Sequence, residues 1–302
     1  MSAPVLYRCT VALPVERRVS TNGISLAIFE WRKDLRGRGD TILLAHATGF
    51  HARCWDQVVR HLGERHVIAV DQRGHGRSDK VLPVHWREFG CDLADLARDL
   101  DLEQIVGVGH SMGGHAMTEA AAAEGRRFRR LVLIDPVIVS PEMYASAHAF
   151  ADGIGTEHPA ARRRNRWASP EEMIERFKNR PPFDAFEVAT LRDYCQYGLL
   201  PQPAGHGFEL ACPPAFESAV YMGSFGNAGV HRSVSAVDVP VLLVRVMEPP
   251  TPLDLLDFRY SPTWPRLAER FKHGREVHLP DRTHFLPMED SALTASYILA
   301  GE

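Results

Sequence analysis

A serine surrounded by glycines is the residue of this sequence best suited to catalysis. The run Gly109-His110-Ser111-Met112-Gly113 follows a predicted strand and opens a predicted helix. A serine on such a sharp strand-to-helix turn presents its hydroxyl above the sheet, and the small neighbours let the strand and helix approach. The helix N-terminus adds a partial positive charge where negative charge develops. We therefore predict that Ser111 is a nucleophile rather than a chance serine in a glycine-rich turn.

His284 is the candidate base for this nucleophile. It follows the last predicted strand by a short loop, which brings it to the sheet edge where Ser111 is expected. A neutral imidazole can take the serine proton and later return it to the leaving group. With 15 histidines in the chain, a solvated loop histidine is the alternative, but the run HFLPMED at this position favours the base.

These residues need a scaffold, and the hydrophobic pattern of the first half of the chain predicts one. Residues 16–31 form a hairpin around Asn22-Gly23, a pair typical of tight turns. The run TILLAH (41–46) is continuously apolar, which suits a parallel strand buried on both faces. Further strands are expected at 66–71, 105–109 and 130–135, and helices at 55–62, 86–100 and 112–124. This alternation predicts a doubly wound, mostly parallel α/β sheet with helices on both faces.

The alternation stops at Pro136 and returns at residue 239. The intervening segment contains helical stretches at 170–179 and 184–200 and no clear buried strand. After it, strands are expected at 239–246 and 276–280, and helices around 264–271 and near 288–300. We expect an α/β core made of residues 1–139 and 236–302, with a mainly helical cap at 140–235.

Together these features resemble the α/β-hydrolase fold superfamily, in particular its capped members with a serine nucleophile. The resemblance covers nearly all of residues 20–300, and the order of serine first and histidine last agrees with it. It is carried by LLAHATGF (43–50), DQRGHGRSD (71–79), GHSMGG (109–114), LVLIDP (131–136) and THFLPMED (283–290). These motifs indicate the fold far more specifically than the substrate, because the fold hosts many chemistries.

The resemblance implies an oxyanion hole made of two backbone N–H groups. Met112, directly after the nucleophile, matches one donor, and Thr48, after the strand at 41–46, matches the other. Such families usually have His-Gly before the second donor. Here His46-Ala47 stands in that place, so the loop departs from the family pattern.

The acid of the expected triad also departs from the pattern. Its usual position, a few residues after the strand at 239–246, holds Pro249, while Glu248 stands one residue earlier and is followed by two prolines. The superfamily has a second location for the acid at the end of the preceding core strand, where Asp135 stands. We prefer Asp135, and Glu248 stays open as the alternative. More distant carboxylates are Asp254 and Asp257.

Composition excludes several classes of protein. The 302 residues are 45% hydrophobic and 24% charged, as in a globular protein, and the net charge of -3 shows no basic excess for nucleic acid or an anionic membrane. No run of 18 apolar residues and no signal peptide are visible. The five scattered cysteines include no CxxC pair, so a reduced, cytoplasmic protein is the expectation.

No cofactor and no metal are expected. The sequence lacks the phosphate-binding glycine motifs, and His110 and His115 have no carboxylate at HExxH spacing, which favours core positions for both. His75, in a glycine-rich loop, is a weak pocket candidate. The basic run 162–166 is expected to be a solvated helix face.

A serine nucleophile favours acyl chemistry. If serine attacked an alkyl carbon it would form an ether, which water does not readily hydrolyse. We expect hydrolysis of a small apolar carboxylic ester or lactone through an acyl-enzyme. A C–C bond hydrolase acting next to a carbonyl and a ligand-sensing receptor with little turnover are the alternatives. The expected partner is the small-molecule substrate alone, with a homodimer left open. Candidate pocket aromatics, of which at least half are expected to be cap core, are Phe150, Trp167, Phe177, Phe183, Phe186, Tyr194, Phe216, Tyr221 and Phe225.

Overall fold

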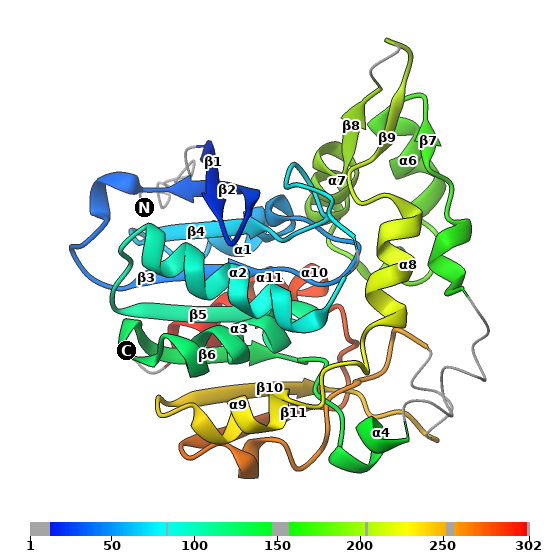
Figure 1. Ribbon diagram of the computed structural model, residues 1–302. Coiled ribbons are helices and arrows are strands. Elements are labelled where there is room, and N and C mark those ends of the chain that lie inside the picture. The colour runs from blue at the N-terminus through cyan, green and yellow to red at the C-terminus, as the bar shows by residue number, and fades with distance from the viewer. Residues whose placement is uncertain (1–12, 83, 147–156, 203–204, 252–256, 301–302) are drawn as a thin grey trace, which may run out of the picture.

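A mostly parallel sheet forms the centre of the molecule (Figure 1). The computed structural model describes residues 13–82, 84–146, 157–202, 205–251 and 257–300, and within these the sheet has eight strands. Their order is β1-β2-β4-β3-β5-β6-β10-β11; β2 pairs antiparallel with β1 and β4, and the other pairs are parallel. This order confirms the mostly parallel α/β sheet that the sequence predicts.

The central strands form because their side chains are apolar on both faces. Every residue of β3 and β4 is buried, as expected for strands covered from both sides. Asn22 and Gly23 turn the β1–β2 hairpin with φ values of 45° and 73°. The strands are β1 (Val15–Thr21), β2 (Ile24–Trp31), β3 (Thr41–Ala45), β4 (His66–Asp71), β5 (Ile105–His110), β6 (Phe128–Ile134), β10 (Val241–Val246) and β11 (Gly274–Leu279).

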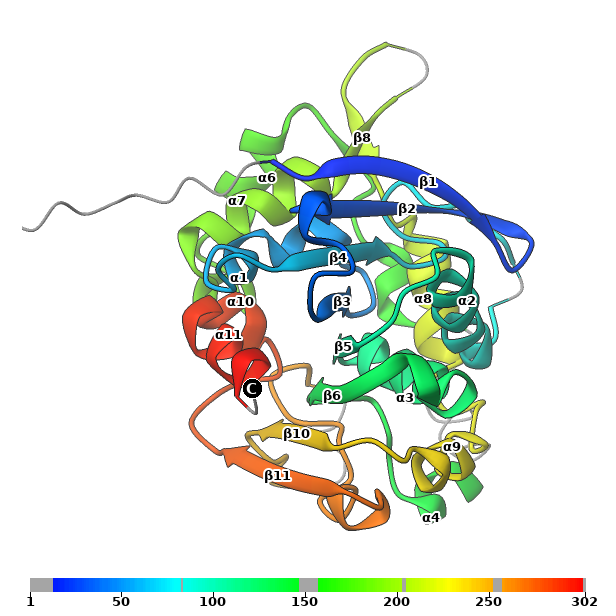
Figure 2. The ribbon, with the colours of Figure 1, turned by 90° about the vertical axis from the view of Figure 1, so that its left-hand side faces the viewer.

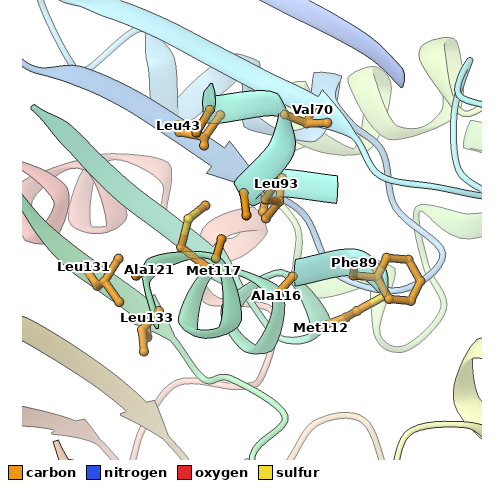
Figure 3. Packing of buried hydrophobic residues seen from close by; sticks show 14 of the residues in the cluster. Leu43, Val70, Phe89, Leu93, Met112, Ala116, Met117, Ala121, Leu131 and Leu133 are labelled. Carbon is orange, nitrogen blue, oxygen red and sulfur yellow. The ribbon is translucent and has the colours of Figure 1, made fainter. Parts of the chain in front are cut away.

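Helices cover both faces of the sheet (Figure 2). One face carries α2 (Trp86–Asp99), α3 (Met112–Ala123) and α9 (Val230–Ala236), and the other carries α1 (Asp56–Val59), α10 (Leu286–Glu289) and α11 (Ser291–Leu299). On the first face, Met117 of α3 belongs to one buried cluster with Leu93 of α2 and Leu131 of β6 (Figure 3). This packing fixes α3, and with it the turn that precedes it, against the sheet.

A second group of elements lies beyond one end of the sheet (Figure 1). It contains α6 (Pro170–Phe177), α7 (Val188–Tyr197), α8 (Pro214–Met222) and the strands β7 (Arg166–Trp167), β8 (Leu199–Pro201) and β9 (Phe208–Leu210). In the described part of the chain these strands form a three-stranded sheet, which the hydrophobic pattern did not predict because strands of two or three residues show no periodicity. The helix α9 falls in the range expected for the cap, yet Val230 and Val234 pack in the core cluster of α3.

Two expected helices differ from the structure. The region 264–271 holds only the 3-10 turn Ala268–Arg270, and the region 55–62 holds the end of a 3-10 turn followed by the four-residue α1. Helices this short form too few backbone hydrogen bonds to be stable without tertiary packing, so the hydrophobic pattern alone does not predict them well. The remaining short elements are α4 (Pro141–Ala145) and the 3-10 turns Lys33–Leu35, Ala52–Trp55, Gly125–Arg127, Pro159–Arg162 and Phe183–Ala185. Among the described residues no helix is long and apolar enough to cross a bilayer.

Candidate active site

Ser111 lies on a strained turn between β5 and α3. Its backbone has φ 57° and ψ -119°, a conformation that residues other than glycine rarely adopt. The turn is tight enough to require its glycines. A Cβ on Gly113 would lie 2.2 Å from the carbonyl oxygen of Ala45, and a Cβ on Gly109 would lie 2.3 Å from the carbonyl oxygen of Gly113. The glycines therefore allow α3 to begin directly against the end of β3.

Three side chains from distant parts of the chain meet at this turn. The Oγ of Ser111 lies 3.0 Å from Nε2 of His284, and Nδ1 of His284 lies 2.5 Å from Oδ2 of Asp135. All three residues are buried. With Nδ1 donating to the carboxylate, the neutral ring leaves Nε2 free to accept the hydroxyl proton of Ser111. The arrangement has the geometry of a nucleophile, a base and an orienting acid.

Strand order explains how Asp135 reaches the histidine. It follows β6, which lies between β5, the strand that leads to Ser111, and β10. Its backbone is left-handed (φ 46°), and its N–H donates to the carbonyl of Val244 in β10 at 2.7 Å. Aspartate tolerates this conformation better than most residues. The carboxylate is thus held at the tip of the sheet, within reach of the loop that carries His284.

The alternative acid, Glu248, does not join this line. Its Oε1 pairs with Nη1 of Arg245 at 2.5 Å, and its side chain is 51% exposed. That ion pair holds the carboxylate at the surface, away from the buried histidine. Asp257 pairs with Arg259 at 2.6 Å, and Asp254 lies outside the described residues.

Asp135 has further partners, which the sequence did not reveal. Its Oδ1 accepts hydrogen bonds from Oγ of Ser261 at 2.5 Å and from the backbone N–H of Val246 at 3.4 Å, and Oγ1 of Thr263 lies 3.2 Å away. Both hydroxyl residues belong to the connection between β10 and β11, the segment in which the resemblance places the usual acid. No motif marks them, because a serine in a loop has no distinctive spacing.

Thr48 and Met112 lie side by side, as the oxyanion-hole prediction requires. The Oγ1 of Thr48 contacts Sδ of Met112 at 3.4 Å, and β3 and β5, which lead to the two residues, are neighbours in the sheet. Met112 is the first residue of α3, where backbone N–H groups have no acceptor within the helix. Ala47, in the place of the usual glycine, fits because the left-handed position of this loop falls on Gly49 (φ 78°).

His75 forms a hydrogen bond with the loop that carries Thr48 and Gly49. Its Nδ1 donates to the carbonyl of Arg73 at 2.9 Å, so Nε2 accepts the N–H of Gly49 at 3.0 Å. Burial lowers the pKa of His75 to about 4, which keeps the ring neutral and able to accept. His75, a weak pocket candidate from the sequence, therefore holds the loop that carries Thr48 and Gly49 and is not among the residues that line the cavity.

His110 and His115, on either side of Ser111 in the sequence, form hydrogen bonds with different parts of the chain. His110 donates from Nε2 to the carbonyl of His284 at 2.7 Å, and burial lowers its pKa to about 3. His115 contacts the carbonyl of Val137 and the side-chain amide of Asn227, each at 3.0 Å. Neither arrangement resembles a ligand set, and the described residues contain no group of three or more metal-binding side chains.

The hydrogen-bonded line of Ser111, His284 and Asp135 opens onto a cavity of about 530 Å³. Ser111, Thr48 and His284 lie in its wall, and Glu157, His158 and Arg162 add polar groups. Most of the remaining lining is aromatic: Phe50, Trp86, Tyr221, Phe225, Phe258, Tyr260 and Phe285. The site therefore combines one polar reacting edge with a large apolar space.

Most of the predicted pocket aromatics pack elsewhere. Tyr221 and Phe225 line the cavity as expected. Phe216 belongs to the core cluster around α3, and Phe150 lies outside the described residues. The others pack against one another and against Phe50 and Phe285 in a separate aromatic cluster, made of Trp167, Phe177, Phe183, Phe186 and Tyr194. Hydrophobic pattern cannot distinguish the wall of a cavity from the packing behind it.

The basic run 162–166 is not simply a solvated face. Arg162 lines the cavity, while Arg163 is paired with the buried Glu217 at 2.5 Å and donates to Tyr194 Oη at 2.8 Å. Arg164 pairs with Glu172 at 2.6 Å. The segment from 157 to 166 is therefore tied to α6, α7 and α8, and the Glu217 carboxylate lies against Gly49 of the loop that follows β3.

The sequence is similar to those of known hydrolases. A family model described as "Alpha/beta hydrolase family" matches residues 42–296. The lipase LipV of Mycobacterium tuberculosis is 36% identical over 100 residues, which are 32% of this chain and 37% of the lipase. The 2-(acetamidomethylene)succinate hydrolase of Mesorhizobium japonicum is 33% identical over 123 residues, which are 40% of this chain and 42% of that protein. The matches thus span less than half of these relatives' lengths.

Solved structures extend the likeness to the whole fold. The crystal structure of an E-2-(acetamidomethylene)succinate hydrolase has a TM-score of 0.69 with this chain at 22% identity, covering 94% of this chain and 97% of that one. At this identity the likeness concerns the fold alone.

Proposed function

The chain belongs to the alpha/beta hydrolase family, and on this premise we propose that it is a serine hydrolase that cleaves a small apolar carboxylic ester or lactone. One observation carries the proposal. The hydrogen-bonded line from Ser111 through His284 to Asp135 opens onto a largely aromatic cavity that Thr48 also lines, and Met112 lies beside Thr48. Similarity to a lipase and to another hydrolase supports a hydrolytic reaction.

The acylation step uses each of these groups. His284 accepts the hydroxyl proton of Ser111 at Nε2 as Oγ attacks the carbonyl carbon. The carbonyl oxygen becomes an oxyanion, which receives hydrogen bonds from the N–H groups of Thr48 and Met112. The imidazolium, stabilised by Asp135, then gives its proton to the alcohol oxygen as the C–O bond breaks. An acyl ester of Ser111 remains.

Deacylation runs through the same groups in reverse. Water takes the place of the alcohol, His284 accepts its proton, and the new oxyanion is held by the same N–H donors. Collapse of this intermediate returns the proton to Ser111 and releases the acid. For a lactone, the alcohol and the acid are the two ends of one product molecule.

The cavity sets the class of substrate. Its volume of about 530 Å³ lies within the range of about 300–1,000 Å³ that is typical of small-molecule sites. Aromatic walls favour an apolar acyl or alcohol group. We propose that the segment 140–235 acts as the cap, because Tyr221 and Phe225, which belong to it, line the cavity. We also propose a reducing cytoplasm, because Cys54, Cys91, Cys195 and Cys212 are all free in the described chain.

Covalent labelling tests the proposal directly. A fluorophosphonate should modify the wild-type protein at Ser111, located by peptide mass mapping, and the Ser111→Ala variant should stay unlabelled. A panel of acyl esters, lactones and meta-cleavage-type diketones then identifies the reaction. Turnover of the diketone alone would indicate a C–C hydrolase, and labelling with negligible turnover of any member would indicate a receptor. Labelling at another residue with Ser111 untouched would refute the mechanism.

A further inference from the structure

The connection between β10 and β11 lacks the family's usual acid but delivers a hydroxyl to the acid present. Oγ of Ser261 lies 2.5 Å from Oδ1 of Asp135, on the opposite carboxylate oxygen from the one that His284 contacts. Ser261 is 2% exposed. Its backbone N–H donates to the carbonyl of Met247 at 2.8 Å, which fixes the residue next to the end of β10.

We infer that Ser261 is a positioning residue that orients the Asp135 carboxylate toward His284. The inference rests on the proposed function, in which Asp135 acts through His284. A carboxylate that receives a hydrogen bond on one oxygen in a fixed direction cannot rotate freely about its Cβ–Cγ bond. With Oδ1 held by Ser261, Oδ2 stays directed at Nδ1 of His284.

The direction of the Ser261 hydroxyl is itself determined. The backbone N–H of Thr263 donates to Oγ of Ser261 at 3.2 Å, so that oxygen already accepts one hydrogen bond. An ionised carboxylate oxygen only accepts, so the Ser261 proton lies between Oγ and Oδ1. One line of hydrogen bonds thus links Thr263 N–H, Ser261, Asp135, His284 and Ser111, and in it the Asp135 carboxylate accepts from both sides.

Thr263 does not share this role to the same extent. Its hydroxyl lies 2.7 Å from the carbonyl oxygen of Pro136 and 3.2 Å from Oδ1 of Asp135. A hydroxyl has one proton, and the carbonyl is the nearer acceptor. The Thr263 hydroxyl therefore mainly secures Pro136, while its backbone N–H holds Ser261.

The position of Asp135 explains why such support is needed. The residue has a left-handed backbone immediately before Pro136, a combination that leaves little backbone freedom to correct the side chain. Val246 N–H, at 3.4 Å, is a long contact. Ser261 is consequently the short side-chain hydrogen bond on Oδ1, and the carboxylate depends on it for its orientation.

Three variants at one position test the inference in the full chain. Ser261→Ala removes the donor, Ser261→Cys fills similar space with a weak donor, and Ser261→Thr retains a hydroxyl. The control is Ser291→Ala, since Ser291 is also 2% exposed and donates to a carboxylate, that of Glu187, at 2.8 Å but lies outside the catalytic line. Each protein is assayed for kcat and KM on the best ester of the panel and for its rate of fluorophosphonate labelling.

We expect Ser261→Ala to lower kcat and the labelling rate by about 10- to 100-fold, because a hydrogen bond to an ionised group is worth about this much. KM should change less than about threefold, since the hydroxyl does not touch the cavity. Ser261→Cys should show a similar loss, Ser261→Thr should keep most of the rate, and Ser291→Ala should stay within about twofold of wild type. If Ser261→Ala does not fold, Ser261→Cys carries the test.

A double-mutant cycle separates positioning from general support. If Ser261 acts through Asp135, then adding Ser261→Ala to Asp135→Asn should cost little further rate, because the orientation no longer serves an acid. Independent, multiplicative losses would overturn the inference. So would wild-type labelling rates in Ser261→Ala or Ser261→Cys. Failure of the wild-type protein to label at Ser111 would instead refute the proposed function, and the two failures are thereby distinct.

Discussion

Replacing Asp135 by Asn changes one atom of the buried line and should remove most of the activity. Asp135 is fully buried, and its Oδ2 accepts from Nδ1 of His284 at 2.5 Å. The Ser261 hydroxyl holds the oxygen of the new amide at the Oδ1 position, so the amide NH2 faces His284. The amide NH2 and the Nδ1–H of His284 would then be two donors facing each other. The ring must therefore carry its proton on Nε2, and Nε2 can no longer accept the hydroxyl proton of Ser111.

The expected loss is large but leaves the fold intact. Exchanging the acid for an amide forces the wrong tautomer and removes the charge that stabilises the imidazolium, which should lower kcat by about 10²–10⁴-fold. That range corresponds to about 2.7–5.4 kcal/mol of transition-state stabilisation. The amide has nearly the size of the carboxylate and keeps an acceptor for Ser261, so we expect the far-ultraviolet circular dichroism spectrum to be unchanged.

The assay compares Asp135→Asn with Glu248→Gln on the same ester, with circular dichroism and Tm for each. Glu248 is paired with Arg245 at the surface and should tolerate the change within about twofold in kcat. A loss of activity in Glu248→Gln with Asp135→Asn unaffected would refute the reasoning. If both variants remain active, the base has another partner.

Three further predictions concern the cavity, the oxyanion loop and acid stability. Phe225→Ala enlarges the cavity and should raise kcat/KM for long acyl chains relative to short ones. Trp167→Ala removes a side chain of the aromatic cluster and should lower Tm, with the same change in kcat/KM for every ester of the panel. The opposite results would mean that Trp167 lines the cavity and Phe225 is packing. His75→Ala removes the acceptor of Gly49 N–H and should lower kcat by about tenfold with little change in KM, and unchanged kcat would contradict a supporting role. Burial lowers the pKa of His51 and His110 to about 3 and of His75 and His115 to about 4, so below pH 6.5 the unfolded chain binds more protons than the folded one and stability falls as pH drops. Each of these histidines should lower the free energy of unfolding by about 1.4 kcal/mol between pH 7.5 and 5.5, and His46, whose pKa burial also lowers, acts in the same direction. Burial raises the pKa of Asp71 and Asp193 to about 6, which offsets part of this loss. Urea unfolding should therefore give a free energy of unfolding several kcal/mol lower at pH 5.5 than at pH 7.5, and equal stabilities would refute the prediction.

The core of the fold was predictable because its signals are local. The continuous apolar runs of β3 and β4, the Asn22-Gly23 turn and the glycines around Ser111 each express a requirement of nearby backbone. The small sheet β7–β9–β8 was missed for the opposite reason. Its strands are two or three residues long, and β7 pairs with β9 across 41 to 43 positions of sequence, although β8 and β9 are only 7 to 11 positions apart.

The site divides in the same way. Ser111, His284, Thr48 and Met112 follow from motifs at strand ends, and the structure brings them together as expected. The preference for Asp135 over Glu248 rests on the resemblance, which implies a second location for the acid at the end of the strand before β10. The roles of Ser261, His75 and His110 could not be predicted in this way, because each depends on a contact with a distant segment of the chain.

The connection between β10 and β11 has a consequence for laboratory evolution of this protein. Phe258 and Tyr260 form part of the cavity wall, while Ser261, the next residue, holds the acid. Saturation libraries that vary this loop to accept bulkier substrates would therefore also sample sequences that misalign Asp135, and broadened selectivity would come with slower turnover. Libraries that diversify positions 258 and 260 while fixing 261 and 263 should break that trade-off, and the surviving clones should retain wild-type labelling rates at Ser111.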